Sequence, residues 1–112
     1  MFDNFPKRIT HRDESSPFTI DATLGGWRMV EGEPGLVQIT IASGTLLDAD
    51  KGEFSLAGVV ITIRLHLGGV DPKAVVNPGD LSEFQQAGLL DAVSTAVRDR
   101  NDAVKNHTGR QT

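Results

Sequence analysis

Apolar and polar side chains alternate with a period of two through the middle of this sequence. The longest such run is residues 59–67, in which polar residues such as Thr62 and Arg64 each lie between two isoleucine or leucine residues. Because successive side chains of a β-strand point to opposite faces, this run predicts a strand with one apolar and one polar face. Residues 18–24 and 36–42 alternate in the same way, and all three runs are rich in the β-branched residues that pleated strands favour.

Three shorter strands are predicted, and segments with turn chemistry separate the strands from one another. These segments are Gly25-Gly26, residues 31–35 and residues 48–52, which are rich in glycine, proline and acidic residues. Such short connections favour antiparallel neighbours in a meander, since a parallel crossover needs about a dozen residues. The shorter strands are expected at residues 8–11, 27–30 and 54–57.

The period becomes helical after the Gly68-Gly69 pair and the turn that follows it. Asp80 is predicted to be the N-cap of a helix, with Glu83 as its reciprocal capping partner. Gly88 weakens the middle of this helix and predicts either a kink or a close packing contact. The apolar stripe of the helix is predicted to comprise Leu81, Phe84, Leu89, Ala92, Val93, Ala96 and Val97.

These segments fit a single α+β domain with a modest core. The chain has 112 residues, of which 38% are hydrophobic, and this is enough for one core. We expect the sheet over about residues 1–70, the helix over residues 80–106 and a flexible tail at residues 107–112.

Composition excludes several classes of protein. The chain has no cysteine, which rules out disulfides and thiolate metal sites. Eleven Lys and Arg against fifteen Asp and Glu give a net charge of -4, so any polyanionic partner would need a local basic face. The N-terminal residues lack the pattern of a signal peptide and no apolar run approaches a membrane span, so we expect no membrane partner.

No pattern of catalytic residues stands out, and we expect neither an enzyme nor a cofactor. His11, His66 and His107 have no metal-site spacing, and no serine lies in a nucleophile elbow. The glycines at 68 and 69 follow a strand, but the rest of a nucleotide-binding fingerprint is absent. We therefore expect no metal ion and no small-molecule substrate.

A sheet of this size needs its apolar face covered, and the sequence supplies a single substantial helix for that purpose. Open sheet edges are a further liability, because their unpaired backbone groups attract other strands. Two copies that pair their sheets and exchange helices would bury both features. We therefore expect a homodimer.

The opposite face of the sheet is predicted to be polar and uncovered. Antiparallel sheets commonly leave such a face in contact with water, which is one interpretation. The other is a platform for a ligand, with Arg64 as its charge and neutral side chains as hydrogen-bonding groups. The candidate binding residues on this face are Arg28, Gln38, Thr40, Thr62, Arg64 and His66.

The predicted elements follow one order along the chain: an N-terminal hairpin, an antiparallel meander, a long last strand at residues 59–67, a break at Gly68-Gly69, and a helix over Asp80 to Phe84 and beyond. This order resembles that of the coat proteins of single-stranded RNA bacteriophages of the levivirus type. The resemblance covers the layout of the whole chain. It implies an intertwined dimer with a continuous sheet, and dimers that assemble into an icosahedral shell. The protein would then reside in the virion capsid, and in the host cytoplasm during assembly.

The resemblance also implies roles for individual residues. The polar face, with Arg28 and Arg64, would contact single-stranded genomic RNA. A loop before the last strands would meet neighbouring dimers, and its candidate residues are Asp48, Asp50, Lys51 and Gly52.

Two other functions stay open at this point. The chain could be a small dimeric phage or bacterial adaptor or regulator whose polar face binds a protein or a small ligand. It could also be a small enzyme with a site at a dimer interface around Arg64 and His66, although no nucleophile and base pattern supports this.

Overall fold

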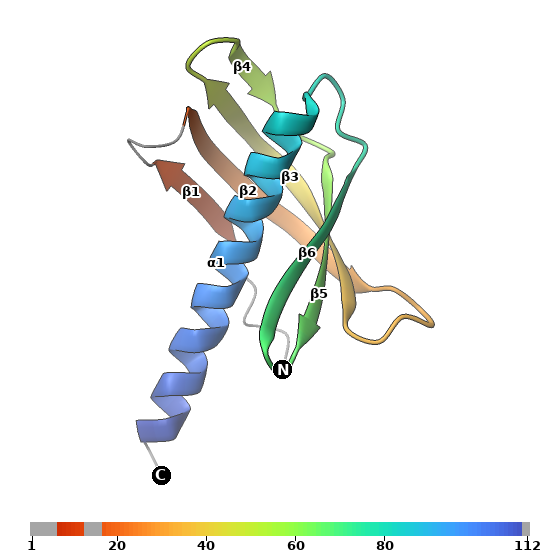
Figure 1. Cartoon of the computed structure of the whole chain (residues 1–112), viewed down its shortest axis with the longest axis vertical. Helices are drawn as coiled ribbons and strands as arrows, with labels where there is room; N and C mark the ends of the chain where they lie inside the picture. Colours follow the sequence, from red (N-terminus) through yellow and green to blue (C-terminus); the bar gives the residue numbers. More distant parts are fainter. Residues whose placement is uncertain (1–6, 13–16, 111–112) are drawn as a thin grey trace.

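The chain folds into one antiparallel sheet of six strands and one C-terminal helix, as the computed structural model in Figure 1 shows. The structure describes residues 7–12 and 17–110, with side chains described to residue 100. The predicted α+β class, the antiparallel sheet and the C-terminal helix are confirmed. The elements are β1 (Arg8–Arg12), β2 (Phe18–Met29), β3 (Leu36–Asp48), β4 (Gly52–Ser55), β5 (Val60–His66), β6 (Gly69–Val76) and α1 (Glu83–Arg110).

The strands follow the order β1-β2-β3-β5-β6, and β4 also pairs with β3. β5 pairs with residues 36–40 of β3, whereas β4 pairs with residues 45–48. The turn between β4 and β5 stays bonded to β3, because Leu56 N–H donates to the Gly44 carbonyl and Ile41 N–H donates to the Val59 carbonyl. β4 and β5 therefore act as one interrupted strand along β3.

β2 runs without a break through Gly25 and Gly26, so the turn predicted at this pair is wrong. The glycines belong to an irregularity in the β2–β3 register between Thr23 and Gly26. A Cβ added at Gly25 would lie 2.9 Å from the Cβ of Ala42, which explains why a residue without a side chain is needed there. The apolar residues of β2 change from even to odd positions across this irregularity, from Ile20 and Ala22 to Trp27 and Met29. The alternation therefore reads as two separate strands rather than one.

The sheet has an edge strand, β6, that the sequence analysis missed. Pro72 lies inside it, and proline cannot donate a ladder hydrogen bond, so it reads as a strand breaker. The strand tolerates Pro72 because it pairs on one side only, with β5, where the register shifts next to Pro72. The sheet therefore continues past residue 70, the predicted end, to Val76.

One helix of the same chain covers the apolar face, whereas the homodimer was expected because a second copy would help to bury it. Ile20, Ile39, Ile41, Ile61 and Ile63 are all at most 1% exposed within a single chain. The helix packs mainly on β6 and also contacts β1, β2 and β5, although β1 and β6 are at opposite ends of the strand order. The sheet therefore curls around α1, which closes the core (Figure 1).

The helix begins with a capping box formed by Ser82 and Gln85. Gln85 N–H donates to Ser82 Oγ at 3.2 Å, and Ser82 N–H donates to Gln85 Oε1 at 2.9 Å. The predicted pair of Asp80 and Glu83 is therefore wrong by two residues. Leu81 is buried and the chain still turns through Gly79, whose φ is 62°, so the helix starts later. It continues to Arg110, past the predicted end at residue 106.

Gly88 marks a close contact between α1 and β2, which was one of the two predicted alternatives. A Cβ added at this position would lie 2.6 Å from Cδ2 of Phe18. Phe18 is 5% exposed, and its ring lies 5.1 Å from the ring of Phe84, one turn earlier in the helix. The absence of a side chain at Gly88 lets the helix rest directly on the Phe18 ring.

We expect Gly88→Ala to destabilise the protein by about 1–3 kcal/mol, because the clash with Phe18 outweighs the gain of about 1 kcal/mol in helix propensity. Chemical denaturation measures the free energy of unfolding. In a Phe18→Leu background the same substitution should cost less, since the ring is gone. A stabilising Gly88→Ala change would show that the helix does not rest on Phe18.

Candidate functional site

The uncovered face of the sheet brings together most of the predicted polar residues. Arg28, Gln38 and Thr62 occupy one cross-strand row on β2, β3 and β5. Thr40 lies in the adjacent row, and Arg64 lies in the row on the other side, opposite Leu36. His66 is at the end of β5, paired with Gly69. Arg28 and Thr40 are exposed, whereas Thr62 is only 7% exposed and offers little surface to a ligand.

Arg28 is held by its cross-strand neighbour Gln38. Its Nε and Nη2 atoms both donate to Gln38 Oε1, at 3.0 and 2.7 Å. Gln38 thus fixes the plane of an exposed guanidinium without neutralising its charge. Because arginine carries five N–H donors, Arg28 retains donors for a phosphate or a base edge.

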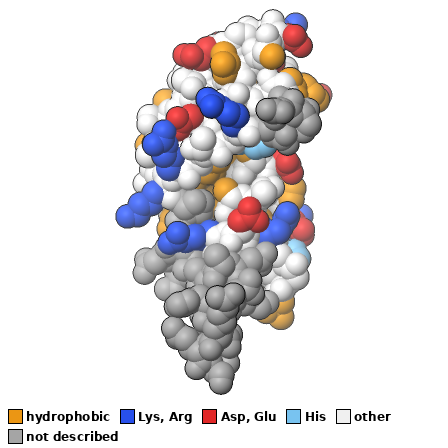
Figure 2. Space-filling view, turned by 90° about the vertical axis from the view of Figure 1, so that its left-hand side faces the viewer, with side chains coloured by type: hydrophobic (Ala, Val, Ile, Leu, Met, Phe, Trp, Pro, Cys, Tyr) orange, Lys and Arg blue, Asp and Glu red, His pale blue; other side chains and the backbone are white. Residues whose placement is uncertain are grey.

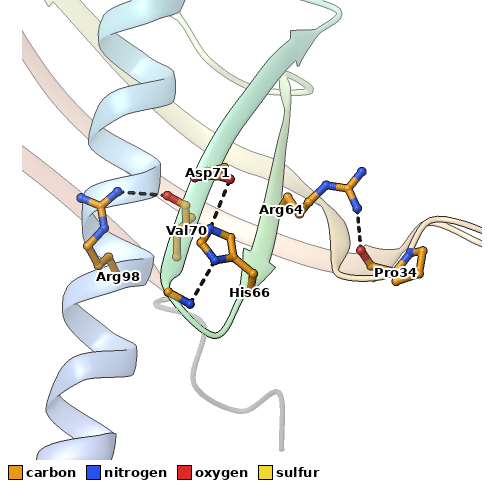
Figure 3. Close-up of polar contacts among 7 residues, drawn as sticks. Pro34, Arg64, His66, Val70, Asp71 and Arg98 are labelled. Atoms are coloured by element: carbon orange, nitrogen blue, oxygen red, sulfur yellow. Dashed lines mark hydrogen bonds and ion pairs between the residues drawn. The ribbon is translucent and has the colours of Figure 1, made fainter.

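Arg64 and His66 are engaged by neighbouring residues of their own chain (Figure 3). Arg64 Nη1 donates to the Pro34 carbonyl at 2.6 Å, and Nη2 forms a 3.3 Å ion pair with Glu33. His66 Nε2 lies 3.2 Å from an Asp71 carboxylate oxygen, and Nδ1 accepts a hydrogen bond from Gly68 N–H. These contacts fasten the β2–β3 and β5–β6 turns to the sheet.

Acidic residues offset much of the positive charge on this face. Arg8 makes a two-point contact with Asp21, at 3.0 and 2.8 Å, and this hydrogen bonding holds the pKa of Asp21 below its ordinary value. Glu33 and Asp71 place acidic groups beside Arg64 and His66, at 3.3 and 3.2 Å. On β2, β3 and β5 the face therefore presents one fixed arginine without an acidic partner, Arg28.

Trp27 cannot join Arg28 in contacting one ligand from this face. It pairs with Ile39, which points into the core, so its side chain lies on the apolar side of the sheet. Trp27 and Met29 are nevertheless 39% and 43% exposed, because they lie near the end of β2. They form an exposed apolar margin of the core.

The predicted inter-dimer loop is the tight turn between β3 and β4. Asp48 ends β3 and is 7% exposed, whereas Asp50, Lys51 and Gly52 are exposed. Asp48 Oδ1 accepts from the N–H groups of Asp50 and Lys51, and Oδ2 accepts from Gln85 Nε2 at 2.8 Å. The bond from Gln85, then those from the turn, lower the pKa of Asp48. Asp48 thus joins the turn to the helix start, and the other three remain available to a neighbour.

A groove between β1 and α1 was not anticipated from the sequence. It has a volume of about 420 Å³, and Figure 2 shows this side of the molecule, where hydrophobic side chains lie among charged ones. The only sequence signal was the four-residue spacing of Asp91, Thr95 and Asp99, and it does not reveal which strand the helix lies beside. The lining residues are Arg8, Ile9, Thr10, His11, Asp91, Ala92, Thr95, Ala96 and Asp99.

Two further searches returned nothing within the described part of the chain. No three His, Asp or Glu side chains lie close enough together there to hold a metal ion. None of its helical segments combines the length and apolar character that crossing a membrane requires. Comparison with protein families, with curated proteins and with solved structures found no match.

Asp48→Asn should destabilise the protein at neutral pH, because a neutral amide replaces a carboxylate that accepts three hydrogen bonds. The pKa of Asp48 is lower in the folded state than in the unfolded chain, where it is about 3.9. The contribution of Asp48 is therefore complete above about pH 5 and is lost as the pH falls through the folded-state pKa. Thermal unfolding of both proteins should show a gap in Tm of several degrees at pH 7 that narrows toward pH 3.

Asp50→Asn is the matched control, since the Asp50 side chain is exposed in the same turn. It should leave the Tm near that of the unmodified chain at every pH. A gap for Asp48→Asn that stays constant with pH would contradict the assigned role of its charge.

Proposed function

We propose that this chain is the coat-protein subunit of a single-stranded RNA bacteriophage, which dimerises and assembles into an icosahedral shell. The observation that carries the proposal is the two-sided sheet: its own helix covers one face (Figure 1), while no described element covers the other face, which carries polar residues such as Arg28 and Gln38. A shell subunit needs this division, because one side faces solvent or neighbours and the other faces the genome. The antiparallel meander followed by a C-terminal helix agrees with the resembled family, although β6, rather than the helix, follows the break at Gly68-Gly69.

The exposed apolar margin at Trp27 and Met29 supports dimerisation. It continues the core, since Met29 pairs with the fully buried Val37. A second copy that covers this margin would remove the side chains from water at about 25 cal/mol per Å² of apolar area. The last turns of α1 extend past the sheet in Figure 1, where they are available to a neighbouring subunit.

RNA contact in this proposal centres on Arg28. The side chain is exposed, Gln38 orients it, and no carboxylate pairs with it among the contacts of the described residues. Arg64 contributes less, because Glu33 already pairs with it. Thr40 and Gln38 supply neutral groups beside Arg28, so the contact would combine one strong charge with hydrogen bonds rather than a wide basic surface.

The alternative is a small dimeric phage or bacterial adaptor that binds a protein or small ligand. The acidic partners of Arg8, Arg64 and His66 favour it, since they leave less free positive charge on the polar face for RNA. Under this proposal the same apolar margin would still drive dimerisation, but no shell would form.

Met29→Glu should convert a dimer into a monomer. Placing a carboxylate in the apolar margin charges the proposed contact, while the exposed position should leave the Tm little changed. Analytical ultracentrifugation measures the mass. Leu67→Glu is the control, because Leu67 is fully exposed at the β5–β6 turn and away from this margin, and it should not alter the mass. A dimer that survives Met29→Glu would place the contact elsewhere.

The protein expressed alone should form particles visible by electron microscopy, and their ratio of absorbance at 260 to 280 nm should show co-purified RNA. Arg28→Ala should lower the RNA content of intact particles, and Arg28→Ala with Arg64→Ala should lower it further. The logarithm of the RNA-binding constant falls linearly with the logarithm of the salt concentration, and each lost phosphate contact should make this slope shallower by about 0.7.

Arg100→Ala serves as the control for this pair, because Arg100 is exposed on the helix rather than on the polar face. Its RNA content should match that of the unmodified protein. A discrete dimer with no particles would favour the adaptor. If Arg28→Ala particles contain as much RNA as unmodified particles, the polar face is not the RNA contact.

A further inference from the structure

Among the described strands, β1 is the open edge of the sheet. The opposite edge, β6, is protected by Pro72, by the irregular register beside it, and by Arg98, whose Nη2 donates to the Val70 carbonyl at 3.0 Å (Figure 3). β4 is four residues long. β1 contains no proline, and the groove described above is lined by both β1 and the helix.

Alternate residues of β1 turn their backbone groups toward the groove. Leu24 N–H donates to the Lys7 carbonyl, which fixes the phase of the antiparallel ladder between β1 and β2. Ile9 and His11, two and four residues further on, therefore bond to β2. The N–H and C=O groups of Arg8, Thr10 and Arg12 point away from β2, where an added strand could pair with them.

The groove has the form of a slot for an extended chain. Ile9, Ala92 and Ala96 give it a floor of small and apolar side chains, and α1 forms its far wall. Its volume of about 420 Å³ lies within the range of about 300–1,000 Å³ that is typical of ligand sites. An edge strand beside a helix can accept a peptide as an extra strand, with main-chain hydrogen bonds giving affinity.

The charges around the groove select the sequence of the peptide. Arg12 is exposed on the outer face of β1, in the same cross-strand row as Thr19, and no acidic partner pairs with it within the described residues. Asp91 and Asp99 border the helix side and have no basic partner there either. An acidic side chain of the peptide is therefore favoured beside Arg12 and disfavoured beside the helix.

We propose that the groove between β1 and α1 binds an extended peptide segment of a partner protein as an added β-strand, with acidic residues on the outer side of the strand and small apolar residues against the floor. The outer positions pair with the arginine side of β1, and the inner positions contact Ile9, Ala92 and Ala96. This binding is independent of whether the chain builds a shell, since the groove lies within one subunit.

Fluorescence anisotropy with two labelled peptides of about eight residues tests the proposal. One peptide alternates glutamate with valine, and the other alternates glutamine with valine, which removes the charge and keeps the shape. The glutamate peptide should bind saturably and at least about tenfold more tightly than the glutamine peptide, a difference of about 1.4 kcal/mol. Absence of saturable binding, or equal affinity for both peptides, would overturn it.

Two variants locate the binding. Thr10→Pro removes an outward N–H without touching the bonds to β2, and Thr95→Trp fills the groove from an exposed helix position. Both should lower the affinity for the glutamate peptide at least about tenfold. If Thr10→Pro does not fold, Thr95→Trp still tests the site, provided that its thermal unfolding is unchanged.

Arg100→Trp is the matched control for Thr95→Trp, since it places the same ring on α1 outside the groove. It should bind the glutamate peptide as the unmodified chain does. Full binding by Thr95→Trp, or an equal loss in Arg100→Trp, would show that the peptide binds somewhere else.

Discussion

The hydrogen bond from Gln85 to Asp48 fixes where the helix starts on the sheet. Gln85 is 2% exposed, and its side-chain amide bonds to two residues. The amide nitrogen donates to Asp48, and the amide oxygen accepts from Ser82 N–H. A buried carboxylate is costly unless it is hydrogen-bonded, and here three donors satisfy it. The β3–β4 turn and the first turn of α1 therefore form one unit, from which the helix crosses the core.

That starting point determines which surfaces the fold leaves open. From Asp48 the helix runs over Phe18 at Gly88 and reaches β6, where Arg98 bonds to Val70. The helix thereby closes the β6 edge and the apolar face. Among the described residues, its path leaves the groove beside β1 open and the polar face without a covering helix. The position of the helix on the curled sheet thus determines where both candidate binding surfaces, the groove and the polar face, lie.

The periodicity in the sequence was enough to predict the sheet faces but not the bends. Val37, Ile39, Ile61 and Ile63 are buried as predicted, because alternation depends only on backbone geometry. The sheet also contains close approaches such as that of Gly44, where an added Cβ would clash with the Asp21 carbonyl oxygen. Such contacts join residues far apart in sequence, so local pattern could not place the groove. For the same reason the sequence could not show that Glu33 would reach Arg64.

The pairing of charges decides what kind of recognition the polar face can support. A basic field attracts any polyanion at long range, but here Asp21 and Glu33 place negative charge beside Arg8 and Arg64, and Asp71 lies beside His66. Binding at this face must then depend on short-range contacts by an oriented group, and Arg28 on Gln38 is such a group. A chain with net charge -4 can contact RNA on these terms, because neighbouring subunits of a shell would repeat the contact many times and each copy need contribute little.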